Sequence, residues 1–114
     1  MDRCCSSSHL TIKDRLNNSK DYSVNVKEVS KIFSLLGEEP RMKILLALME
    51  GELCVYHICE ITGGKQSATS QHLKKLKDNN IIKCKKNANQ VVYSIADEHI
   101  VEIIKMALVH KDCK

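Results

Sequence analysis

No stretch of the chain approaches the roughly 20 consecutive apolar residues that a helix needs to cross a bilayer. The first 22 residues are polar and lack the apolar core of a secretory signal. Internal repeats, low-complexity tracts and a nucleophile–base arrangement typical of an enzyme are also missing from the sequence. We therefore expect a cytoplasmic protein that has no membrane partner and catalyses no reaction.

The composition is that of one small globular domain. The chain has 114 residues, of which 43% are hydrophobic and 28% are charged. A chain of this size buries only a modest core, so a homodimer with a shared core is plausible. In a reducing cytoplasm its six cysteines are available for metal or redox chemistry rather than for disulfides.

Positive charge is concentrated in one segment. The net charge of +4 is weak evidence for an anionic partner. Between residues 74 and 86, however, six lysines are offset only by Asp78, which suits contact with DNA phosphates. A solvated helix face followed by a hairpin is the alternative interpretation of the same charges.

The hydrophobic pattern predicts the fold. Residues 1–22 are expected to form a flexible N-terminal arm, in which a short helix is possible, and residues 23–114 a DNA-binding and dimerisation domain. The predicted fold class is mainly α (α+β): a winged helix-turn-helix with a β-hairpin wing and terminal dimerisation helices. The predicted helices cover residues 24–36, 38–50, 55–62, 66–78 and 97–112, and the predicted strands cover 81–86 and 90–95.

The helix predicted at residues 66–78 is the candidate reading helix. Leu73 and Leu76 are expected to face inward, together with Ala68 or Thr69. A glutamine such as Gln71 can contact adenine with two hydrogen bonds, whereas lysines meet phosphates. The predicted DNA-binding residues are Gln66, Ser67, Ser70, Gln71, His72, Lys74, Lys75 and, in the hairpin, Lys86.

Two segments carry a family resemblance. The segments ELCV, at 52–55, and QSATSQHLKKL, at 66–76, resemble the ArsR/SmtB family of metal-responsive transcriptional repressors, and the similarity covers residues 26–112. The resemblance implies a homodimer that binds double-stranded operator DNA when metal-free and releases it on binding a transition or heavy metal ion.

The last predicted helix carries candidate metal ligands at both ends. His99 and His110 are 11 residues apart, about 16 Å along a helix, so one ion cannot join them within one chain. An antiparallel partner helix can bring Asp97 and His99 of one chain beside His110 and Cys113 of the other. This spacing matches the family's site on that helix. Because a cysteine is the fourth ligand, we expect Zn(II) or a similar ion such as Cd(II) as effector.

A cysteine-based sensor is the alternative. Cys54 lies in the ELCV segment, where Tyr56 replaces the family's second cysteine, and Cys59 matches a cysteine of the arsenic-sensing branch. Cys4 and Cys5 in the arm complete a possible second site for a metal or metalloid. The protein could then be an arsenite- or redox-responsive DNA-binding regulator, or these cysteines could simply be buried. A winged helix used only for protein contacts is a further alternative.

Overall fold

The computed structural model describes residues 6–18 and 21–113, with side chains from residue 11 onward. The chain packs as two units, residues 1–34 and 35–114. Among the described residues, no helix is both long and apolar enough to span a membrane.

The first unit is helical. Helix α1 (Ser6–Asn18) lies within the segment predicted as an arm. Helix α2 (Tyr22–Leu36) begins two residues before the predicted start, and its last two residues, Leu35 and Leu36, are buried in the core of the second unit. The flexibility of the arm and the domain boundary after residue 22 stay predictions.

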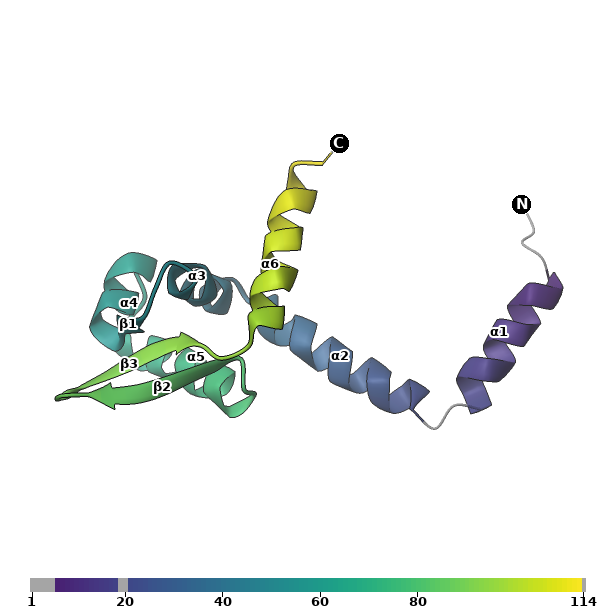
Figure 1. Cartoon of the computed structure of the whole chain (residues 1–114), viewed down its shortest axis with the longest axis horizontal. Coiled ribbons are helices and arrows are strands. Elements are labelled where there is room, and N and C mark those ends of the chain that lie inside the picture. The colour runs from purple at the N-terminus through teal and green to yellow at the C-terminus, as the bar shows by residue number, and fades with distance from the viewer. Residues whose placement is uncertain (1–5, 19–20, 114) are drawn as a thin grey trace. The chain divides into compact units, whose positions relative to one another are not determined.

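The second unit has the order of a winged helix. Three helices come first, and the β2–β3 hairpin then runs beside them before the chain turns into the last helix (Figure 1). In chain order its elements are α3 (Glu39–Leu48), β1 (Leu53–Cys54), α4 (Val55–Thr62), α5 (Gln66–Asp78), β2 (Ile82–Asn87), β3 (Gln90–Ile95) and α6 (Glu98–Lys111).

Local sequence explains where the helices begin and end. Helix α3 opens with Glu39 and Pro40, a residue that suits the first turn because it has no N–H to leave unpaired. Gly63 ends α4 in the left-handed conformation, at φ 77°, and its N–H donates to Cys59. Helix α5 stops at Asn79 and Asn80, where Asn80 has a φ of 62°.

The three strands form an antiparallel sheet in the order β1-β3-β2. The predicted hairpin is confirmed, with Asn87 pairing with Gln90 so that the turn contains two residues rather than three. The sequence did not indicate β1, whose Leu53 and Cys54 pair with Tyr93 and Val92 of β3. This short strand ties the start of α4 to the hairpin.

One apolar core holds the second unit together. Each fully buried leucine or isoleucine stabilises the fold by about 1.5–3 kcal/mol relative to an exposed one. Helix α5 contributes Leu73 and Leu76 to this core. Their burial determines which side of α5 faces solvent. The buried cluster contains Leu35, Leu36, Ile44, Leu45, Leu48, Ile58, Leu73, Leu76, Ile81, Ile82, Ile100 and Ile104.

Candidate nucleic-acid interface and metal ligands

Helix α5 is amphipathic, and its outer side carries the predicted DNA-binding residues. Thr69 joins Leu73 and Leu76 on the buried side. Of the two residues expected to face inward, Thr69 is therefore buried and Ala68 is exposed. His72 is half-buried at the flank of the helix. The exposed predicted residues of α5 are Gln66, Ser67, Ser70, Gln71, Lys74 and Lys75. Their contact with DNA stays a prediction.

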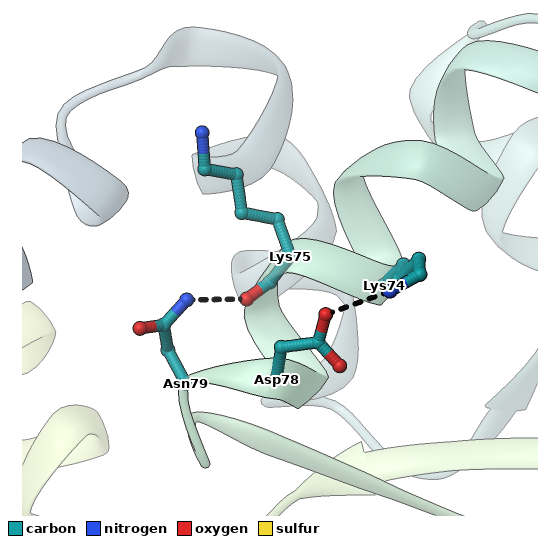
Figure 2. Close-up of polar contacts among 4 residues, drawn as sticks. All are labelled: Lys74, Lys75, Asp78 and Asn79. Atoms are coloured by element: carbon teal, nitrogen blue, oxygen red, sulfur yellow. Dashed lines mark hydrogen bonds and ion pairs between the residues drawn. The ribbon is translucent and has the colours of Figure 1, made fainter.

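The C-terminal end of α5 has its own polar contacts. Lys74 Nζ donates to Asp78 Oδ2 at 2.9 Å, and the Asn79 amide nitrogen donates to the Lys75 carbonyl at 2.8 Å (Figure 2). The second contact satisfies a carbonyl oxygen of the last helical turn. The first is an exposed ion pair, which contributes about 0.5 kcal/mol or less to stability. Lys74 is therefore held by a weak pair that a DNA phosphate can replace.

The hairpin adds a second basic surface. Lys83, Lys85 and Lys86 are all exposed on β2. Lys85 Nζ lies 3.4 Å from Glu52 Oε2, beside β1, while Lys86 lies nearer the tip of the hairpin. An exposed lysine near the tip of a wing is well placed for phosphate contact.

The two ends of α6 carry the predicted metal ligands. Asp97 is the N-cap: its Oδ1 accepts from the His99 backbone N–H at 2.9 Å and lies 2.9 Å from His99 Nδ1. At the other end His110 and Cys113 are both exposed. The Cys113 N–H donates to the His110 carbonyl at 2.9 Å, which keeps these two residues in one turn.

These residues fit a metal as two half-sites rather than as one site. An exposed carboxylate oxygen and imidazole nitrogen 2.9 Å apart can share one ion after a small rotation of their side chains. No three residues of the His, Cys, Asp and Glu types converge on one point within residues 6–18 and 21–113 of the single chain. The metal-ligand roles of Asp97, His99, His110 and Cys113 stay predictions.

Of the four cysteines of the possible second site, the structure describes Cys54 and Cys59. Cys4 and Cys5 lie outside the described residues. Cys54 is buried at the N-cap of α4, and its Sγ lies 3.3 Å from Nδ1 of the exposed His57. Cys59 is half-buried farther along α4. The contact between Cys54 and His57 was not expected from the sequence, although the C-x-x-H spacing of these two residues is a signal for it.

Sequence comparison identifies the family. The model described as bacterial regulatory protein, arsR family, matches residues 38–83, which include α3, α4 and α5. A cadmium resistance transcriptional regulatory protein CadC homolog from Staphylococcus aureus is 34% identical over 102 residues, covering 87% of this chain and 84% of that protein. The chain belongs to the arsR family. This membership agrees with the ArsR/SmtB resemblance of its ELCV and QSATSQHLKKL segments.

Two solved structures share the fold. A winged helix-turn-helix DNA-binding domain from Mycobacterium bovis, Mb0332, superposes with a TM-score of 0.75 at 24% identity, covering 83% of this chain and 88% of that one. The antimony-specific transcriptional repressor AntR gives a TM-score of 0.73 at 27% identity, covering 83% of this chain and 86% of AntR. The predicted fold class is thus confirmed.

Family membership settles the general function. Proteins of this family are DNA-binding transcriptional regulators rather than enzymes, so this chain is a winged helix-turn-helix transcriptional repressor. The alternative of a winged helix used only for protein contacts loses its support.

Proposed function

We propose that this arsR-family repressor binds operator DNA as a homodimer and is released by a transition or heavy metal ion held across two α6 helices. Zn(II) or Cd(II) is the proposed effector, and the cytoplasm, where the operator lies, is the proposed location. The observation that carries the proposal is the 2.9 Å contact of Asp97 Oδ1 with His99 Nδ1 at one end of α6, together with the backbone hydrogen bond that keeps His110 and Cys113 in one turn at the other.

The surface of α6 supports the homodimer. His99, Ile103, Met106 and His110 follow one another at spacings of four, three and four residues, so they share one face of the helix. Met106 is 70% exposed on this face, whereas Ile100 and Ile104 point into the core. A second α6, packed antiparallel on this face, buries Met106 and brings opposite ends of the two helices together.

The donor set supports a soft or borderline divalent ion. In the proposed site Asp97 and His99 of one chain would hold the ion together with His110 and Cys113 of the other. Four ligands of the N, O and S types suit tetrahedral zinc, and a thiolate raises the affinity for softer ions such as cadmium. The CadC homolog is named for cadmium resistance, which favours the same class of effector here.

The chain's own residues would make metal binding a switch. Within a dimer, the face of α6 between His99 and His110 sets how the two chains pack, and this packing sets the separation of the two α5 helices. A metal bound between the helices would favour one packing over the other. By linkage, the metal must then lower DNA affinity by the same factor by which DNA lowers metal affinity.

The test compares DNA binding with and without zinc. The probe is a duplex selected from a randomised pool by the metal-free protein. Zinc is expected to weaken binding by about 10-fold or more in the wild type and to have no effect in His99→Ala or His110→Ala. Glu102→Ala, which removes an exposed acidic side chain from the same helix and belongs to neither candidate site, is the matched control and should respond as the wild type does. An unchanged wild-type affinity in zinc would rule out metal regulation through α6.

A cysteine-based regulator is the second candidate, favoured by the contact between Cys54 and His57. A sulfur and an imidazole nitrogen 3.3 Å apart are as close as two ligands of one soft ion. AntR, which resembles this chain in fold and sequence, is antimony-specific. Antimony, like arsenic, binds thiols. In this alternative an arsenite ion or an oxidant acts at Cys54, with Cys59, Cys4 and Cys5 as further candidate thiols.

Two substitutions separate the candidates. If thiols sense the effector, Cys54→Ser abolishes the loss of DNA binding caused by arsenite or oxidant, and His110→Ala leaves it intact. Cys84→Ser, which alters a half-buried thiol on β2, is the matched control. The reverse pattern, in which only His110→Ala abolishes a response, would discard the cysteine-based regulator.

A further inference from the structure

A pocket beside the helix-turn-helix has no role in the function described so far. It lies between α3 and α5 and has a volume of about 230 Å³. Helix α3 contributes Lys43, helix α5 contributes Thr69 and His72, and the turn between α4 and α5 contributes Gly63 and Gly64. The pocket therefore opens where the reading helix begins.

The hydroxyl group of Thr69 lines this pocket without a partner. Thr69 is only 3% exposed, and no hydrogen bond to its hydroxyl is found among the residues that the structure describes. A buried polar group without a hydrogen bond is unfavourable, so a ligand that pairs with it is favoured. A Cβ at Gly64 would lie 2.8 Å from Thr69 Oγ1, so glycine keeps the space beside the hydroxyl open.

The remaining polar groups of the pocket favour an anion. Lys43 is exposed and makes no ion pair within the described part of the chain, and the half-buried His72 likewise has no polar partner there. No acidic residue is among the residues that line the pocket. An ammonium group, an imidazole and a hydroxyl group thus line one pocket, and each can donate a hydrogen bond to a phosphate oxygen.

The position of the pocket selects the source of the phosphate. Ser67 and Gln71 are exposed on the face of α5 predicted to contact base edges, whereas His72 lies on the flank of the same helix. A helix in the major groove has a sugar–phosphate backbone along each flank. We propose that a phosphate of the DNA backbone binds in this pocket, held by Lys43, Thr69 and His72, so that α3 takes part in DNA binding. This proposal is independent of the metal response.

The test is the salt dependence of DNA binding by the metal-free protein. Each lysine that neutralises a phosphate contributes about one unit to the slope of log K against log salt. Lys43→Gln should therefore reduce the slope by about one and weaken selected and scrambled duplexes by the same factor, about 3- to 10-fold. Thr69→Val, which keeps the shape of the side chain, should weaken both duplexes with no change of slope.

A matched control and a second measurement complete the test. Lys105→Gln removes the same charge from an exposed position on α6 and should leave the slope unchanged. The amide resonances of Gly63 and Gly64 are followed during titration with duplex and with inorganic phosphate. A shift caused by duplex and abolished in Lys43→Gln supports the proposal. Equal slopes for Lys43→Gln and wild type would overturn the proposal. Amide resonances that shift with inorganic phosphate but not with duplex would overturn it as well.

Discussion

Asp78 is the acidic residue closest to the predicted phosphate contacts of α5. Its carboxylate pairs with Lys74 at 2.9 Å, and both side chains are more than half exposed. In the predicted phosphate contact, DNA would have to compete with this carboxylate for the lysine. The pair is thus expected to limit DNA affinity rather than to stabilise the fold.

We predict that Asp78→Asn strengthens DNA binding. The substitution frees Lys74 and removes a negative charge that repels phosphates, so affinity should rise about two- to fivefold, and more at low salt. Fluorescence anisotropy of a labelled duplex, measured at several salt concentrations, provides the readout. Asp112→Asn, which breaks the comparable pair with Lys111 on α6, should leave affinity unchanged. An equal gain in both variants would mean that net charge alone is responsible.

Single residues also show where prediction from the sequence reaches its limit. Leu73 and Leu76 were assigned to the core from their spacing, and the same helical face explains why Thr69 is buried. The angular spacing of a helix could relate Cys54 to Cys59 only if both residues lay within one helix. Cys54 instead lies in β1 and caps α4, so the angular spacing of a helix does not apply to it, and His57 of the first turn folds back onto its sulfur.

At the scale of elements, local sequence signals predicted the helices, whereas the strands depend on which segments of the chain pair with one another. Proline, glycine and asparagine placed the ends of α3, α4 and α5 within a residue or two. Strand β1 has only two residues and exists because β3 offers it a partner about 40 residues later, a long-range contact that no local pattern encodes. The hairpin was predicted because both of its strands are adjacent in sequence.

The start of α6 combines two roles in Asp97, and two substitutions separate them. Asp97 caps the helix through the His99 N–H and is a proposed metal ligand. Asp97→Ala should lower the free energy of unfolding by about 1 kcal/mol, because the cap is lost. Asp97→Asn keeps a capping oxygen and should preserve stability, yet both variants should bind zinc at least about 10-fold more weakly.

Chemical denaturation of the metal-free protein and competition with a zinc chelator measure the two effects. Glu98→Gln changes a neighbouring acid in the first turn of α6 and is the control for charge near the helix terminus. Zinc affinity that follows stability across the variants, instead of following the carboxylate, would contradict a ligand role for Asp97.

At the scale of the whole molecule, the surface carries exposed apolar residues that a partner chain in the proposed homodimer would cover. On α2 they include Val26, Val29 and Phe33, spaced three and four residues apart, and on α6 they include Met106 and Val109. The sequence could identify these stripes as apolar, but it could not distinguish a core face from an interface. That distinction depends on which face the tertiary fold covers. On α6 the fold covers Ile100 and Ile104 and leaves Met106 and Val109 exposed.

We predict that Met106→Glu converts the proposed dimer to a folded monomer. Two isologous copies would bury this carboxylate near its counterpart, whereas in one chain the side chain is 70% exposed and contributes little to the core. Sedimentation velocity should show the change in mass, and circular dichroism should show retained helix. Because one monomer offers one α5 to the operator, DNA affinity should fall by about 100-fold or more.

Two controls make this prediction specific to the interface. Val91→Glu introduces the same charge at an exposed apolar position of the hairpin and should leave the dimer intact. Mixing Met106→Glu with Met106→Lys chains should restore a dimer, because opposite charges then face each other across the two-fold axis. A Met106→Glu protein that still sediments as a dimer would show that the α6 face does not form the interface. The proposed metal site would then lose its second pair of ligands, since His110 and Cys113 can reach Asp97 and His99 only from another chain.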